Sequence, residues 1–272
     1  MLPAAGSVLG IDVGGSLTRR STAVCRLSWT PRSVDWVIER STAEPARRAA
    51  TIARVAGGHD LLAAALDGPL TAGLQPTDAY RAAERMLTRG LGRLIGKPGQ
   101  SNVPVGRLLN AQANACARDV LALGLLAAAR HDQAIDAAAI VEAFPSSYLG
   151  LMLADPAGIA VQRGTRSDRY FELLAGNGLL ADLLASLLPG RHAVTSVQAL
   201  RNHDDRAALI CALTALGLAA GDYCAVGDAQ GWIVLPPLRF IAPWAQALLR
   251  ANLVPGFGGC LITGNLGQPS LF

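Results

Sequence analysis

Apolar runs separated by turn residues predict β-strands at the start of the chain. Residues 8–13 are a short apolar run that ends at a Gly-Gly pair, which is typical of a buried strand entering a tight turn. Two further strand-like runs follow at 21–29 and 33–40, with a Thr-Pro-Arg segment between them. The three runs therefore predict an antiparallel meander.

Helical and strand patterns alternate in the middle of the sequence. We expect helices at 44–55, 77–91 and 107–130; the first has an early proline and is followed by two glycines, as is common at helix ends. Short apolar runs at 60–66 and 138–141 predict two buried strands. A strand that follows a helix in this way is expected to lie parallel to the strand before it.

The second half of the chain has mainly helical patterns. A Pro-Ser pair at 145–146 opens one helix, and longer helices and two short strands follow. The helices are expected at 168–188, 203–220 and 240–252, and the strands at 223–226 and 232–235.

The order of these elements defines the expected fold class. Three strands followed by alternating helices and strands predict an α/β protein whose mixed sheet has an antiparallel edge and a parallel remainder. This is the connectivity of a ribonuclease H-like sheet. We find no internal repeat and no linker, so we expect one domain over 1–272, with helical insertions near 77–130 and 150–200 and a C-terminal extension at 236–272.

Composition restricts the class of protein. The chain has 272 residues, of which 51% are hydrophobic and 16% charged, so it can bury a large core and is unlike a disordered segment. The longest uncharged stretches, at 120–129 and 207–221, are shorter than a membrane helix, and no basic segment precedes the first apolar run. We therefore expect a cytoplasmic protein with no membrane partner.

Cysteine spacing and net charge exclude little else. The five cysteines are widely spaced, with no CxxC pair, which argues against disulfides and structural zinc. The net charge of +4 comes from arginine, whose planar guanidinium suits phosphate and carboxylate groups. An excess this small does not identify a partner by itself.

Acidic residues at strand ends are the strongest indication of chemistry. Asp12, Asp67 and Glu142 each close a predicted core strand, and Asp204 begins the helix at 203–220. Functional groups of parallel sheets gather at the carboxyl ends of the strands, so the four acids are candidates for one site. Such carboxylates repel each other unless a cation neutralises them, and their oxygen atoms favour Mg²⁺ or Mn²⁺. His203 is a candidate for assisting a water molecule there.

This set of residues predicts catalysis by metal ions. Two ions about 3.5–4 Å apart can activate water and stabilise the leaving oxygen of a phosphodiester. The alternative is that each acid has only a local role, since aspartates are common in turns and in the first turn of helices.

Five ordered segments of the chain resemble a known family. They are VLGID at 8–12, LDGPL at 66–70, RAAER at 81–85, VEAFPS at 141–146 and HDDRAALICALTA at 203–215. Together they resemble domain-of-unknown-function family four-twenty-nine, whose members are described as predicted nucleases with a ribonuclease H-like fold. The resemblance covers roughly residues 8–235 and implies a divalent-metal-dependent nuclease acting on nucleic acid.

One position departs from the family pattern. The helix motif of the family usually carries a second acid three residues after the first, and here that position is Ala207. Either Asp205 replaces the missing ligand, or the remaining acids suffice, or this member is catalytically impaired. An impaired member would bind nucleic acid or a protein without cleaving it.

Basic residues and glycines supply two further candidates. Arg81 and Arg85 begin a series at four-residue spacing, which includes Arg89 and Arg93, and could contact phosphates along a helix; a solvated helix face is the alternative. Residues 11–18, with Gly14 and Gly15, also resemble the phosphate-binding hairpin of sugar kinases and actin.

That resemblance makes an ATP-dependent phosphotransferase the rival prediction. We find no second hairpin of the kind those proteins need, and the glycine-rich segment 256–259 only superficially matches an adenosine-contacting segment. The sequence therefore favours the nuclease.

Overall fold

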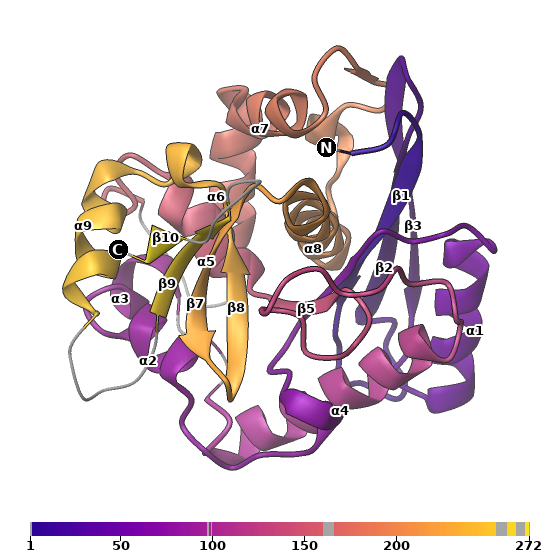
Figure 1. The fold of residues 1–272 in the computed structure, drawn as a ribbon, viewed down its shortest axis with the longest axis horizontal. Helices are drawn as coiled ribbons and strands as arrows, with labels where there is room; N and C mark the ends of the chain where they lie inside the picture. Colours follow the sequence, from indigo (N-terminus) through magenta and orange to yellow (C-terminus); the bar gives the residue numbers. More distant parts are fainter. Residues whose placement is uncertain are drawn as a thin grey trace.

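A single mixed β-sheet forms the centre of the molecule (Figure 1). The computed structural model describes residues 2–96, 98, 100–159, 166–253, 260–264 and 270–271. Its strands lie in the order β10-β9-β7-β8-β5-β4-β1-β2-β3-β6. They are β1 Gly6–Asp12, β2 Thr22–Trp29, β3 Ser33–Ser41, β4 Ala64–Asp67, β5 Ile140–Ala143, β6 His192–Ala193, β7 Tyr223–Asp228, β8 Gly231–Leu235, β9 Cys260–Gly264 and β10 Ser270–Leu271.

Strand directions agree with the sequence pattern. β1, β2 and β3 form an antiparallel meander, and β1, β4, β5 and β8 pair in parallel. The far edge is antiparallel again, where β7 pairs with β8 and β9. The predicted α/β class with a mixed sheet is confirmed. The expected extension at 236–272 contributes β9 and β10 to the same sheet.

Helices cover both faces of the sheet. They are α1 Pro45–Ala56, α2 Ala82–Thr88, α3 Gly92–Ile95, α4 Pro104–Leu121, α5 Pro145–Met152, α6 Arg166–Gly176, α7 Leu179–Leu187, α8 His203–Ala220 and α9 Pro243–Ala251. α8 packs against β1, β2 and β4 on one face, whereas α1 and α4 pack together on the other (Figure 1). The described residues form three apolar clusters: one on the α8 side of the sheet, one on the side of α1 and α4, and one around α2, α3 and α9 beside β7 and β8.

Gly10 allows α8 to approach the sheet closely. A Cβ atom at this position would lie 2.1 Å from the backbone nitrogen of Ala212 and 2.4 Å from the carbonyl oxygen of Ala208. Only glycine permits such an approach, since any side chain would overlap the backbone of α8. The packing fixes the start of α8 relative to the end of β1.

Several expected helices are shorter than the periodicity indicates. The helix expected at 77–91 is replaced by α2 and α3, because Gly90 adopts a positive φ of 71° between them. The helix expected at 168–188 is divided into α6 and α7 by Gly178, whose φ is 86°. α4 ends at Leu121, before the predicted limit of 130.

Two further observations concern membrane-spanning helices and the glycine-rich segment near the C-terminus. No helix among the described residues is both long and apolar enough to cross a membrane. The glycine-rich segment 256–259, considered above for its resemblance to an adenosine-contacting segment, lies outside the described residues.

Candidate carboxylate site

Asp12 and Asp67 lie side by side at the carboxyl edge of the sheet. Asp12 is the last residue of β1 and Asp67 the last residue of β4, and the two are register partners in this parallel pair. Side chains of register partners project from the same face of a sheet. That face is the one covered by α8, because Gly10, two residues before Asp12, contacts α8. The structure therefore brings two of the predicted acids together.

Both carboxyl groups are in an environment that opposes ionisation. Burial raises the pKa of Asp12 well above its ordinary value, and the charges of Asp67, Asp204 and Asp205 raise it further. The pKa of Asp67 rises to about 7, chiefly through burial and then through the charge of Glu142. Neither side chain has a hydrogen-bond or ion-pair partner in the described part of the chain. A proton or a cation would relieve the repulsion between them.

The first turn of α8 supplies two more acids to the same end. Asn202 caps this helix and accepts hydrogen bonds from the backbone nitrogens of Asp204 and Asp205. Burial raises the pKa of both carboxyl groups. One oxygen of Asp205, Oδ1, is buried without a hydrogen bond, although Nε of Arg40 lies 3.4 Å from it. The charges of both Asp204 and Asp205 thus act on Asp12; the sequence named Asp204 as a ligand and Asp205 only as a possible replacement for the acid absent at 207.

His203 is directed toward a neighbouring helix. Its Nδ1 lies 3.1 Å from Oδ1 of Asp168 in α6, and half of the side chain is exposed. Arg206 also contacts Asp168, at 3.2 Å. His203 is therefore engaged with α6, and no contact in the described structure links it to Asp12 or Asp67.

Glu142 does not join the carboxylate site, which corrects the sequence prediction. It is the register partner of Leu66, one position before Asp67, so its side chain projects from the opposite face of the sheet. Arg81 holds it with two hydrogen bonds of 2.7 and 2.9 Å, and the backbone nitrogen of Leu70 donates a third of 2.8 Å. On the α8 face, the register partner of Asp67 is Ala143.

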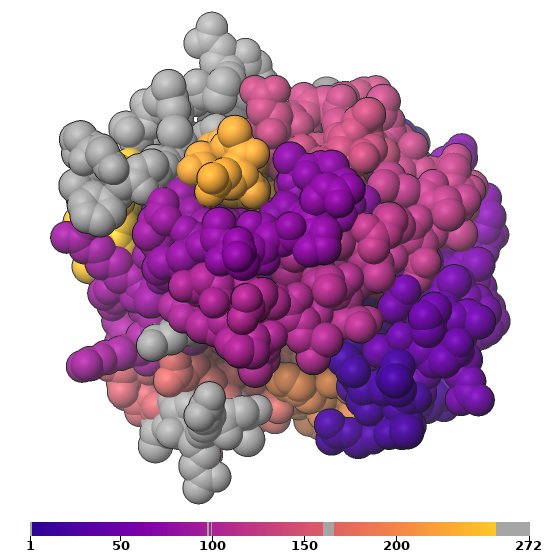
Figure 2. All heavy atoms as spheres, turned by 90° about the horizontal axis from the view of Figure 1, so that it is seen from below, coloured from indigo at the N-terminus to yellow at the C-terminus, as the bar shows by residue number. Residues whose placement is uncertain are grey.

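Arg81 is an interior residue, which corrects its predicted role on a phosphate-binding stripe. Its side chain is fully buried, and Nε donates a 2.8 Å hydrogen bond to Glu84. Ser101 donates to the same carboxylate at 2.7 Å. A buried network of one arginine and two glutamates therefore connects α2 to β5. Arg81 and Glu84, both from the sequence segment at 81–85, are therefore members of this buried network. Figure 2 shows the face of the molecule on which segments drawn in violet and magenta lie at the surface.

Arg85 is likewise not part of a continuous basic surface with Arg81. It is half-buried, donates a hydrogen bond to the carbonyl oxygen of Tyr80 and lies 5.8 Å from the centre of the Tyr80 ring. Arg89 and Arg93 are exposed. The four-residue spacing therefore does not give one basic stripe, because the first member is in the core.

The loop between β1 and β2 carries the predicted glycines. A Cβ atom on Gly14 would lie 2.2 Å from the carbonyl oxygen of Ser21, whereas one on Gly15 would meet nothing within 4 Å. The Gly14 nitrogen donates a 3.1 Å hydrogen bond to Oγ1 of Thr22. Gly14 therefore closes the loop, and Gly15 lies at its exposed side.

Ala207 lies in an apolar recess near α5. It is 9% exposed, and it lines a small hollow with Pro145 and Leu149, beside His203 and Arg206. Among the described residues, no three His, Cys, Asp or Glu side chains form a group that could hold a metal ion. Of the four predicted carboxylate ligands, Glu142 lies on the opposite face, Asp12 and Asp67 are adjacent, and Asp204 acts on Asp12 through its charge.

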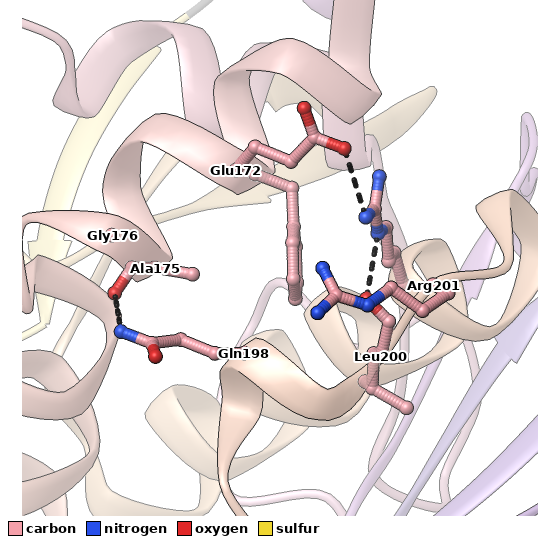
Figure 3. A pocket seen from close by; sticks show the side chains of 8 residues that line it. Glu172, Ala175, Gly176, Gln198, Leu200 and Arg201 are labelled. Carbon is pink, nitrogen blue, oxygen red and sulfur yellow. Dashed lines mark hydrogen bonds and ion pairs between the residues drawn. The ribbon is translucent and has the colours of Figure 1, made fainter.

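A larger pocket lies beside the start of α8, between α6 and the segment 198–201 (Figure 3). Its volume is about 410 Å³. Arg201 reaches into it, Glu172 pairs with Arg206 at 3.0 Å on one side, and Gln198 donates a 3.0 Å hydrogen bond to the carbonyl oxygen of Ala175 on the other. No sequence pattern predicted this pocket, because its residues come from separate elements.

Comparison with known families, curated proteins and solved structures finds no match to this chain. The chemistry of the site must therefore be argued from its own geometry.

Proposed function

We propose that the protein is a divalent-metal-dependent nuclease in which Asp12 and Asp67 hold the cation. The observation that carries this proposal is the pair of register-matched carboxylates with no partner in the described chain. Two like charges this close destabilise the fold unless something positive lies between them. A metal ion supplies that positive charge and can also activate water for hydrolysis.

The residues present fit one Mg²⁺ or Mn²⁺ ion. Mg²⁺ commonly binds through one or two carboxylates, keeps several waters and takes further oxygens from substrate phosphates. Asp12 and Asp67 supply the two carboxylates, and Asp205, whose buried Oδ1 has no hydrogen bond but is ion-paired with Arg40, lies at the same end of the sheet. Such an ion does not require three or more protein ligands, and no group of three such side chains occurs among the described residues.

The arrangement of the strands supports a ribonuclease H-like architecture. The order β3-β2-β1-β4-β5, with antiparallel β1 to β3 and parallel β1, β4 and β5, is the one expected for that fold. The resemblance of five sequence segments to the predicted nucleases of family four-twenty-nine points the same way. The proposed reaction is hydrolysis of phosphodiester bonds in nucleic acid.

A bound ion would polarise a phosphoryl oxygen and lower the pKa of a coordinated water. The residues of the chain position the ion and add negative charge around it. Asp12 and Asp67 hold the ion at the edge of the sheet, and α8 shields it from one side. Asp204 and Asp205 add negative charge that favours binding of the cation.

A catalytically impaired member of the same fold is the second candidate. Two observations favour it: the expected acid at 207 is alanine in an apolar recess, and Glu142 is held by Arg81 on the opposite face. Such a protein would bind nucleic acid without cleaving it.

The test is cleavage of defined substrates. Purified protein is incubated with Mg²⁺ or Mn²⁺ and single-stranded, double-stranded, hybrid and branched nucleic acids. We expect metal-dependent cleavage that Asp12→Asn and Asp67→Asn abolish. Asp60→Asn is the matched control, because Asp60 is an exposed carboxylate that precedes β4 at its other end. Equal cleavage by the Asp12 variant, or none by the native protein, would defeat the nuclease proposal.

A further inference from the structure

A row of register partners crosses four strands and ends in an arginine. Asp67 pairs with Asp12, Asp12 with Ala23, and Ala23 with Arg40. Register partners share a face, so Arg40 projects toward α8, as the two aspartates do. Its Nε lies 3.4 Å from Asp205, in the first turn of α8. The row therefore carries a cation-binding pair at one end and a guanidinium at the other.

Two more arginines flank this row from the loop between β1 and β2. Nε of Arg20 donates a 3.1 Å hydrogen bond to the backbone oxygen of Arg40, which leaves the terminal nitrogens of Arg20 exposed. Arg19 is exposed, and its guanidinium makes no hydrogen bond within the described part of the chain. Its charge, with that of Arg40, acts on Asp204 and opposes the rise in the pKa of that carboxyl group. Arg19 and Arg40 thus lie near the acids, and Arg20 lies beside Arg40; we refer to Arg19, Arg20 and Arg40 as the arginine group.

The charges of these side chains nearly cancel. The ionised forms of Asp12, Asp67, Asp204 and Asp205 carry one more charge than the arginine group. When all four acids are ionised and no cation is bound, this edge is net negative and repels a phosphate. One bound divalent ion reverses the sign, so that the edge attracts a phosphate and the exposed guanidiniums can donate paired hydrogen bonds to it.

We propose that the arginine group Arg19, Arg20 and Arg40 binds the phosphodiester backbone of nucleic acid, and that a divalent cation at Asp12 and Asp67 switches this binding on. The inference rests on the proposed function for the cation site alone, since binding does not require cleavage. In this proposal the phosphates are bound by arginines on the face where the acids lie, and not by Arg81 and Arg85 as the sequence predicted.

A cation requirement distinguishes this surface from ordinary basic patches. Nucleic acid bound only by arginine or lysine is released when salt or Mg²⁺ competes for the phosphates. Here Mg²⁺ is expected to strengthen binding at low concentration, because it first neutralises the carboxylates.

The experiment measures binding by fluorescence anisotropy with a labelled 20-nucleotide single strand and a duplex of the same sequence. Titrations are made at 4 °C in EDTA and in 2 mM Mg²⁺ at constant ionic strength, and a denaturing gel verifies that the probe is intact. For the native protein we expect at least a threefold gain in affinity with Mg²⁺ for one or both probes. Asp12→Asn should remove this gain.

The arginine variants test the surface itself. Arg19→Ala with Arg40→Ala should weaken binding in Mg²⁺ at least tenfold and reduce the salt slope for the single strand by about 1.4, since each lost phosphate contact contributes about 0.7. Arg19→Ala alone is the second variant, because removing an unpartnered exposed side chain leaves the fold intact. Arg93→Ala, at an exposed site in α3, is the matched control and should bind as the native protein does.

Two outcomes would overturn the inference: unchanged binding by the double variant, or weaker binding of the native protein in Mg²⁺ than in EDTA. They are distinct from failure of the proposed function. If the native protein cleaves nucleic acid and the double variant binds and cleaves equally well, the arginine surface is wrong and the nuclease stands. If nothing is cleaved but Mg²⁺-dependent binding needs Arg19 and Arg40, the surface stands and hydrolysis is excluded.

Discussion

Asp12 and Asp67 are register partners at the ends of two adjacent parallel strands, with their side chains on the face covered by α8. Neighbouring strands lie about 4.8 Å apart, so two carboxylates in this relationship interact strongly whenever both are ionised. Each residue is also partly buried, and desolvation raises the pKa of both carboxyl groups. The two ionised carboxylates therefore repel each other at this edge of the sheet. A proton, a neutral side chain or a cation removes the repulsion.

Asp67→Asn should stabilise the metal-free protein above neutral pH. The pKa of Asp67 is about 7 in the folded protein against an ordinary value of 3.8. The folded state therefore binds this proton more tightly than the unfolded state does, and its contribution to stability is lost as pH rises from about 3.8 to about 7. Asparagine does not titrate. In EDTA at pH 8 we expect the variant to be more stable by about 1–3 kcal/mol.

Urea unfolding at pH 4, 6 and 8 checks this expectation. Only the difference between the variant and the native protein is used, because groups such as Glu39, whose pKa is lowered by its hydrogen bond with Arg54, titrate with the opposite sign. The difference should grow with pH between 4 and 7 and then remain constant. A difference that does not change with pH would show that Asp67 has no raised pKa.

Divalent cations should stabilise the native protein and neither aspartate variant. A ligand that binds only the folded state adds about 1.4 kcal/mol at ten times its dissociation constant. For a chain of this length that corresponds to a rise of roughly 2–4 °C in Tm. Differential scanning fluorimetry with Mg²⁺ and Mn²⁺ measures the shift in the native protein, Asp12→Asn and Asp67→Asn. An equal shift in all three would place the cation elsewhere.

Arg81→Met should destabilise the fold without a direct effect on nucleic acid. The change leaves the buried carboxylates of Glu84 and Glu142 without their shared cation, and loss of one partner from a buried ion pair costs about 3–5 kcal/mol. Arg93→Met, at an exposed site, should cost less than about 0.5 kcal/mol. Chemical unfolding measures both. A loss under about 1 kcal/mol combined with weaker nucleic-acid binding would instead return Arg81 to the substrate-binding residues.

Local patterns were sufficient to predict the pair of aspartates. Both acids directly end apolar strands, and the order of elements makes those strands parallel neighbours. The start of α8 was also predicted, because a long apolar helical pattern begins at 203 with Asp204 in its first turn. These features depend on residues close together in the sequence, or on topology that follows from element order.

Glu142 shows what local patterns cannot supply. The sequence predicted a strand at 138–141 with Glu142 just after it, but β5 continues to Ala143 and Glu142 lies inside it. Side chains alternate between faces, so a shift of one residue moves a carboxylate to the other side of the sheet. Register between β4 and β5 is set by packing across the whole sheet. For the same reason the sequence did not indicate Arg40, whose position relative to Asp12 depends on pairing across three strands.

Gly10→Ala should be far more costly than Gly15→Ala, although both glycines lie near Asp12. An added Cβ at position 10 would lie 2.1 Å from the Ala212 nitrogen, which belongs to a helix backbone that cannot move alone. α8 would have to shift away from β1 and β4, and we expect a loss of about 3 kcal/mol or more, at the upper end of overpacking costs. At Gly15 the added atom meets nothing within 4 Å, so stability should change by less than about 0.5 kcal/mol.

Chemical unfolding of both variants, with Mg²⁺ titration of each, tests this prediction. Similar stability losses in the two variants would show that α8 is not packed against Gly10. Since the first turn of α8 carries Asp204 and Asp205, we also expect Gly10→Ala to weaken cation binding, while Gly15→Ala leaves it unchanged.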